Sequence, residues 1–201
     1  MRTTTLFITG GLIALGLTVG LPYLARVQHE QDLQSGLSVI NNLQQVQNVL
    51  DAHELVQQEL GFRATFPSKP ERTQLPSGGW FYLNNHESGV FGVAVQNILP
   101  SRAAEDVLAG ALQGMLERIP SHQILELTPC LEVPGMRGVD IHIQGIMDGF
   151  TVRTWSRVLV GPKQLFIVNA TTDDLALVDR FIGSFALLTP SRKPIVDQMP
   201  L

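Results

Sequence analysis

The chain has 201 residues, of which 44% are hydrophobic and 16% are charged, and its formal net charge is −4. This composition is typical of a folded protein and excludes a highly charged, disordered chain. The sequence has no cluster of lysine and arginine residues, so nucleic acid is not an expected partner. Cys130 is the only cysteine, which excludes an internal disulfide.

An uncharged apolar run, Leu6–Leu24, lies near the start of the chain. At about 1.5 Å per residue, a helix of this length crosses the roughly 30 Å hydrocarbon core of a bilayer. Arg2 precedes the run and Arg26 follows it, and no further lysine or arginine occurs before Arg63. Basic residues favour the cytoplasmic side, so the short N-terminus is expected to stay inside and the rest to lie outside. We therefore expect residues 1–26 to be a single-pass anchor in the lipid bilayer.

A cleaved signal peptide is the alternative for the same residues. Signal peptides combine a basic start, an apolar core of about 7–15 residues and small residues at the cleavage site. The sequence Thr18-Val19-Gly20 would serve as such a site, whereas Tyr23 is too bulky before Ala25. The apolar run is longer than a typical signal core, which favours the anchor. Cleavage would instead release a secreted or periplasmic protein.

Residues 27–61 are rich in glutamine, lack proline and are predicted to form a helical stalk. One apolar stripe has the 4-3-4 spacing of a helix face and consists of Val39, Leu43, Val46 and Leu50. The heptad pattern continues on neither side, so a long coiled coil is not predicted. A stalk, or a helix lying on the domain, is the simpler interpretation. The alternative is a surface for self-association.

Residues 62–188 are predicted to form one globular domain, followed by a loose, proline-containing tail at 189–201. Short alternating or apolar runs predict the strands Phe62–Phe66, Trp80–Leu83, Gly89–Gln96, Ile124–Leu127, Met136–Gly145, Phe150–Val160 and Gln164–Ala170. Asp148-Gly149 predicts a tight hairpin turn.

Two amphipathic helices are also expected in the domain. The first is predicted to begin at the cap Ser101 and to end near Arg118. The second is predicted to begin near Thr172 and to bury an apolar stripe that includes Val178 and Phe181. Hairpins combined with helical connections predict an α+β fold, in which an antiparallel sheet is flanked by helices.

Three segments carry a resemblance to a known family. They are Phe66-Pro67-Ser68-Lys69-Pro70 after the first strand, the Asp148-Gly149 turn, and Arg180-Phe181-Ile182-Gly183-Ser184-Phe185 near the end. In these segments the chain resembles PsbP/Mog1-like α/β/α sandwich domains. The resemblance implies the fold and a role in binding or assembly, and no functional residue is carried over from it.

No catalytic motif is present in the sequence. The five histidines lack metal-binding spacing, and there is no nucleophile elbow, phosphate-binding loop or dinucleotide fingerprint. We therefore assign no catalytic residue, metal or cofactor.

The polar face of the Asp148-Gly149 hairpin is the candidate ligand site. Its candidate residues are His142, Arg153, Trp155 and Arg157, beside Asp140 and Gln144. Paired arginines with a tryptophan would suit an anion or a peptide carboxylate, and a histidine beside a carboxylate would suit proton transfer. The simpler alternative is a solvated sheet face, where cross-strand pairs contribute roughly 0.2–1 kcal/mol each.

These features predict a membrane-anchored, extracytoplasmic binding or assembly module with protein partners. One alternative is an envelope enzyme whose site forms only in three dimensions. A second is a scaffold that self-associates into a homo-oligomer through the stalk helix.

Overall fold

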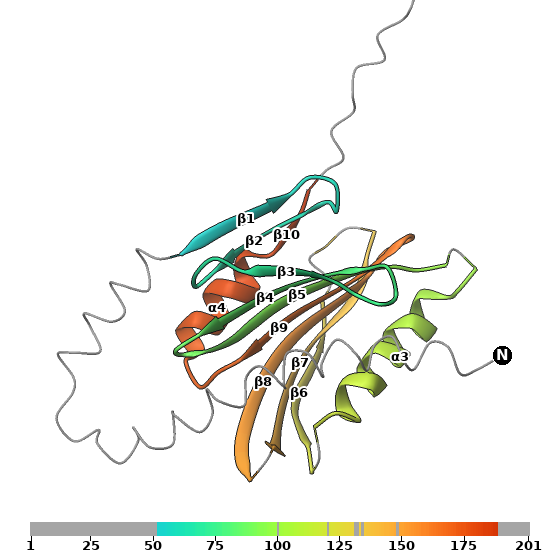
Figure 1. The fold of residues 1–201 in the computed structure, drawn as a ribbon. Helices are drawn as coiled ribbons and strands as arrows, with labels where there is room; N and C mark the ends of the chain where they lie inside the picture. The colour runs from blue at the N-terminus through green and yellow to red at the C-terminus, as the bar shows by residue number, and fades with distance from the viewer. Residues whose placement is uncertain are drawn as a thin grey trace, which may run out of the picture.

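The computed structural model describes residues 52–188, apart from 100, 120, 131–132, 134 and 148. These residues form an α+β fold of mostly antiparallel strands with two helices (Figure 1). The elements are β1 His53–Gln57, β2 Phe62–Phe66, β3 Glu71–Gln74, β4 Trp80–His86, β5 Gly89–Asn97, α3 Ala104–Leu116, β6 Gln123–Pro129, β7 Arg137–Met147, β8 Phe150–Val160, β9 Gln164–Thr171, α4 Leu175–Ser184 and β10 Ala186–Leu187.

The strands are arranged in two sheets. The large sheet has seven strands in the order β3-β4-β5-β9-β8-β7-β6, and the small sheet has three in the order β1-β2-β10. Neighbouring strands are antiparallel in both sheets. Helix α3 and helix α4 lie on opposite sides of the large sheet, and the small sheet lies on the α4 side (Figure 1).

Two apolar cores lie on the two faces of the large sheet. Successive side chains of a strand point to opposite faces, so Val158 joins the core beneath α3 and Leu159 joins the core beneath α4. On the α4 side, the ring of Phe181 lies 4.9 Å from that of Phe66 in the small sheet. The same ring lies 5.4 Å from that of Phe91 in the large sheet. Helix α4 therefore joins the two sheets.

The β7–β8 hairpin forms where the sequence predicts it. Met147 pairs with Phe150, and Gly149 has a φ of +87°, a left-handed conformation that favours glycine. Asp148 lies outside the described residues. The predicted alternation along β7 is confirmed, because Ile141 and Ile143 belong to the core beneath α3.

The two helices begin differently from each other. Asp174 caps α4, since its carboxylate accepts hydrogen bonds from the backbone N–H of Ala176 at 3.0 Å and of Leu177 at 3.2 Å. The predicted cap of the first helix, Ser101, is wrong. Helix α3 begins after Ala103, whose side chain makes no capping hydrogen bond.

The predicted stalk helix is wrong over its last part. His53–Gln57 form β1, in which Leu55 pairs with Ala64 of β2, so the domain begins earlier than residue 62. Pairing with an available strand here outweighs the local helical pattern. The remaining part of the predicted stalk, the apolar run Leu6–Leu24 and the tail at 189–201 lie outside the described residues. Among the helices that are described, none is long and apolar enough to cross a membrane.

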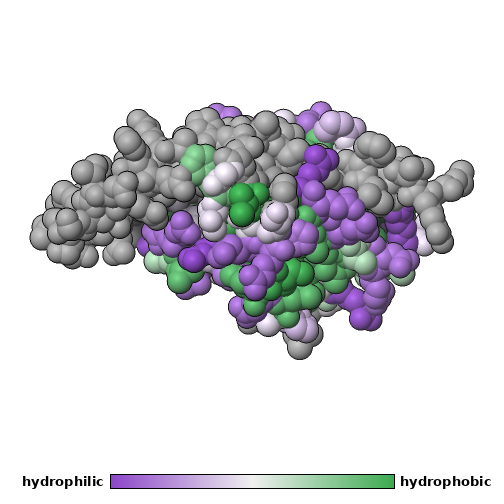
Figure 2. Space-filling model, turned by 90° about the horizontal axis from the view of Figure 1, so that it is seen from below, coloured by the Kyte–Doolittle hydropathy of each residue, from purple (hydrophilic) through white to green (hydrophobic). Residues whose placement is uncertain are grey.

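Strands β6, β7 and β8 extend beyond the rest of the sheet at the lower end of the view in Figure 1. Seen from this end, the surface has an apolar area bordered by hydrophilic residues (Figure 2). The large apolar side chains that β6 and β7 expose are Ile124, Leu125, Leu127 and Ile146. This half of the sheet is therefore only partly covered.

Phe181→Ala tests the role of α4 in joining the sheets. The phenyl ring is 1% exposed, and its loss should lower the free energy of unfolding by about 3–5 kcal/mol. Urea unfolding of the full-length chain in a nonionic detergent measures this change. Leu175→Ala on the same helix is the control, because Leu175 is 59% exposed and should change the value by about 0.5 kcal/mol or less. Equal effects of the two variants would contradict the assignment.

Candidate functional site

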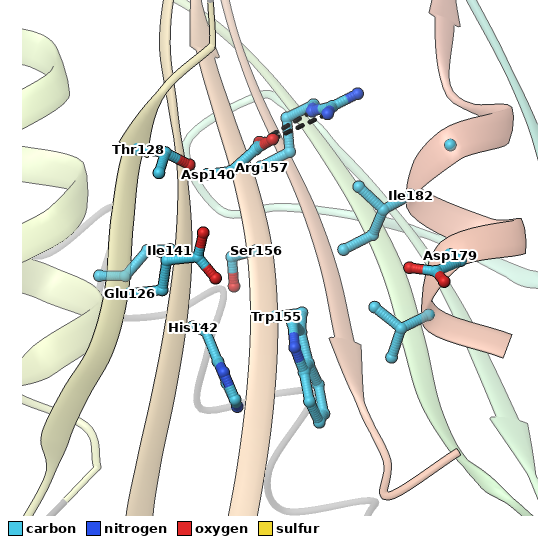
Figure 3. A pocket seen from close by; sticks show the side chains of 12 residues that line it. Glu126, Thr128, Asp140, Ile141, His142, Trp155, Ser156, Arg157, Asp179 and Ile182 are labelled. Atoms are coloured by element: carbon cyan, nitrogen blue, oxygen red, sulfur yellow. Dashed lines mark hydrogen bonds and ion pairs between the residues drawn. The ribbon is translucent and has the colours of Figure 1, made fainter. Parts of the chain in front are cut away.

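A pocket of about 300 Å³ lies between α4 and the strands β6, β7 and β8. It forms on the α4 face of the sheet, where α4 packs mainly against β2, β9 and β8 and leaves part of β7 and β6 uncovered. Side chains from the strands and from the helix face one another across this space (Figure 3). The polar side of the β7–β8 hairpin forms the sheet wall of the pocket.

The register between β7 and β8 brings the predicted polar residues together. Three directly opposed pairs lie on the same face, and they are Asp140 with Arg157, His142 with Trp155, and Gln144 with Arg153. Antiparallel strands place directly opposed side chains about 4.5–5.5 Å apart at Cβ, close enough for each pair to interact. Sequence alone left open whether the two sets share one face, and the register answers that they do.

Asp140 and Arg157 form a bidentate ion pair at one end of the pocket. Arg157 Nε donates to Asp140 Oδ1 and Arg157 Nη2 donates to Asp140 Oδ2, both at 2.8 Å (Figure 3). The Arg157 side chain is only 14% exposed. Such fork-to-carboxylate pairs combine charge attraction with fixed geometry. The guanidinium is therefore already occupied by a carboxylate of the protein.

His142 and Trp155 form a flat aromatic stack in the sheet wall of the pocket. Their ring centroids are 4.3 Å apart and their planes differ by 16°. Burial of the imidazole lowers the pKa of His142, and the positive charge of Arg153 lowers it further, whereas Glu126 opposes the shift. The ring is therefore neutral at pH 7. Its Nε2 atom is shielded from water and has no hydrogen-bond partner among the described residues.

Arg153 does not line the pocket. Its Nε donates to Gln144 Oε1 at 3.2 Å, and its Nη1 lies 3.8 Å from Asp173 Oδ1. Of the four predicted ligand-binding residues, the structure thus places His142, Trp155 and Arg157 around one pocket, with Arg153 beside it.

Sequence reasoning missed two carboxylates and the helix wall of this pocket. Glu126 and Thr128 come from β6, and Asp179 and Ile182 come from α4. Glu126 and Asp179 are both exposed, and neither forms an ion pair with another described residue. Glu126 is opposite His142 in the register, a relation that could be predicted only once β6 was known to pair with β7. Nothing in the sequence indicates that Asp179 lies across from it.

Ser156 and His142 do not form a nucleophile–base pair. Ser156 borders the pocket, but its hydroxyl donates to Asn169 Oδ1 at 2.5 Å, and its side chain lies on the opposite sheet face from His142. The pair therefore lacks the contact that a nucleophile needs with its general base. In the part of the chain that the structure describes, no group of three or more histidine, cysteine or acidic residues could hold a metal ion.

Comparison with known proteins gives resemblance at the level of the fold alone. No family model and no curated protein matches the chain. LpqN of Mycobacterium tuberculosis, described as involved in cell envelope biogenesis, has 14% identity and a TM-score of 0.46 over 69% of this chain and 83% of its own. PA94 of Pseudomonas aeruginosa, a protein of unknown function, has 14% identity and a TM-score of 0.39 over 63% and 86%. A Bacteroides thetaiotaomicron protein has 10% identity and a TM-score of 0.42 over 69% and 49%.

The lowered pKa of His142 predicts a pH dependence of stability. Below the ordinary value of 6.5, the unfolded chain takes up a proton on this imidazole more readily than the folded chain does. The free energy of unfolding should therefore fall as the pH drops below about 6.5 and level off beneath the folded-state pKa. His142→Gln should reduce this fall, as measured by urea unfolding between about pH 8 and pH 5. Identical pH profiles for the variant and the parent chain would contradict the prediction.

Proposed function

We propose that this protein is a membrane-anchored binding module that works outside the cytoplasm. The length and apolar character of Leu6–Leu24 support the anchor. Between this run and Arg63, Arg26 is the only lysine or arginine, which supports an extracytoplasmic position for the domain. The pocket between α4 and strands β6–β8 is the observation that carries the binding function.

The chemistry of this pocket supports binding as its role. It combines an aromatic stack, apolar side chains of α4 and a few polar groups, a composition typical of ligand sites. Its strongest polar contact, between Asp140 and Arg157, holds the two strands in a fixed relation rather than presenting a reactive group. A fixed wall of this kind reduces the ordering cost of binding.

A protein is the expected partner. The pocket reaches β6, which is the last strand of the described sheet on that side. An edge strand presents unpaired backbone groups with which an extended polypeptide can pair. The side chains of such a polypeptide would lie next to Glu126 and Thr128 and could enter the pocket.

We further infer that the domain is a PsbP/Mog1-like sandwich. Three points support this assignment: the antiparallel sheet with a helix on each face, the Phe66–Pro70 segment directly after β2, and the Arg180–Phe185 segment at the end of α4. The small sheet is an addition on one side of this arrangement. Members of this group are binding or assembly modules, in keeping with the proposed function.

Export of the domain is tested with alkaline phosphatase fused after Leu201 in a bacterial host. The enzyme is active only after export, so the fusion should be active and should sediment with membranes. Leu12→Arg combined with Leu15→Arg is the control. Each arginine at the centre of a span raises the free energy of membrane insertion by about 2.5–3.5 kcal/mol, so the fusion should lose its activity. The proposal would be contradicted if a reporter that works only in the cytosol were active at the same fusion point while alkaline phosphatase was not. A parent chain found fully in the soluble fraction would also contradict it.

Binding at the pocket is tested by placing a photoreactive amino acid at Thr128 in the anchored chain. Thr128 borders the pocket, so irradiation of cells should give discrete adducts with a partner. The matched control carries the same amino acid at Gln113, an exposed position on α3 on the opposite side of the sheet. Adducts that are the same from both positions would show that the pocket is not the contact site.

A further inference from the structure

We propose that the pocket beside α4 binds an organic cation, namely the ammonium or guanidinium group of a lysine or arginine side chain in a partner polypeptide. This inference rests on the proposed binding function and names the ligand of the same pocket. It follows from the balance of charges around the pocket, from the nature of its walls and from its size.

The charged groups around the pocket leave a negative balance. Asp140 and Arg157 neutralise each other through their bidentate contact. His142 is neutral at pH 7, because burial and Arg153 lower its pKa. The two remaining charged groups that line the pocket, Glu126 and Asp179, are both carboxylates.

The two carboxylates come from opposite walls of the pocket. Glu126 projects from β6 and Asp179 projects from α4, with the His142–Trp155 stack on one side of the space between them (Figure 3). Two carboxylates facing a common space attract a cation and repel an anion. The anion or peptide carboxylate considered from sequence is therefore not favoured by this geometry.

The walls between the carboxylates suit an aliphatic stem. Val178 and Ile182 on α4 and the indole of Trp155 on β8 provide apolar surface between the charged positions. Lysine and arginine bury their methylene stems along such surface while the charged end reaches a polar partner. A small inorganic cation has no aliphatic stem and would make no apolar contact with these walls.

The size of the pocket favours one side chain over a larger ligand. A volume of about 300 Å³ lies at the lower end of the range for small-molecule sites, roughly 300–1,000 Å³. The position of Glu126 and Thr128 on the edge strand β6 leaves the pocket open to a residue that belongs to a longer chain. A lysine or arginine in an extended segment offers one side chain of suitable size and belongs to a longer chain.

The test uses the full-length chain in a nonionic detergent, with Trp80→Phe so that Trp155 is the remaining tryptophan. Its fluorescence is followed during titration with capped glycine–X–glycine tripeptides, where X is lysine, acetyl-lysine or glutamate. We expect a saturable change with the lysine peptide alone, and weaker binding as salt screens the charges. Binding of the acetyl-lysine peptide as tight as that of the lysine peptide would overturn the proposal.

Glu126→Gln combined with Asp179→Asn should weaken binding of the lysine peptide by about tenfold or more, equivalent to ~1.4 kcal/mol. The matched control is Asp106→Asn with Glu117→Gln, which removes the same charge from exposed positions on and just after α3. We expect no change in affinity from the control pair. Equal weakening by both pairs would overturn the site, since net charge alone would then explain the binding.

Other outcomes separate this inference from the proposed function. A lysine peptide that does not saturate up to about 10 mM, or saturable binding of the glutamate peptide, would overturn the cation assignment and leave the binding module in place. Tighter binding of free 1,5-diaminopentane than of the lysine peptide would overturn the polypeptide as its source. Failure of export with lysine-peptide binding intact would overturn the proposed function alone.

Discussion

The structure depends on the burial of the large sheet on both of its faces along its central strands. Strand β8 illustrates this constraint, because Val158 and Leu159 are adjacent, are both 0% exposed and belong to different cores. A shift of one residue in the pairing of β8 would exchange the two faces and place Arg157 in the core beneath α3. The register of β7, β8 and β9 is therefore fixed by packing on both sides.

The pocket results from where this two-sided burial ends. Helix α4 has 10 residues and covers β9 and part of β8, but β7 and β6 continue beyond it. Polar residues occupy the part of this open surface that borders the pocket. Asp140 and Arg157 satisfy each other there, and Trp155 marks the boundary, since it packs partly against the core and partly against His142.

The sequence predicts those parts of the fold that depend on local periodicity. Alternation along β7 and β8 identified their two faces, and Asp148-Gly149 identified the turn between them. Strand β1 was mistaken for helix because its partner, β2, supplies the stabilising contacts. Strand β3 was missed for a related reason: all four of its residues are exposed, so no apolar alternation marks it, and its partner is β4.

The candidate site was likewise predictable only where it depends on local periodicity. Alternation grouped Trp155 with Arg157 on β8, and His142 with its neighbours on β7, but the register between the two strands was needed to place both sets on one face. Glu126 and Asp179 lie on other elements, and only the packing of α4 over the sheet brings them to the same pocket.

The sign of the charge that the site accepts is decided by contacts rather than by composition. Read as a sequence, Arg153 and Arg157 beside Trp155 indicate an anion site. In the structure, Arg157 is held by Asp140 at 2.8 Å, and Arg153 is directed toward Gln144 and Asp173, away from the pocket. An incoming carboxylate would have to displace Asp140 from a largely buried guanidinium, and that exchange gains no new charge pair while it exposes Asp140 beside Glu126. A cation meets no such competition, because neither Glu126 nor Asp179 has an ion-pair partner among the described residues.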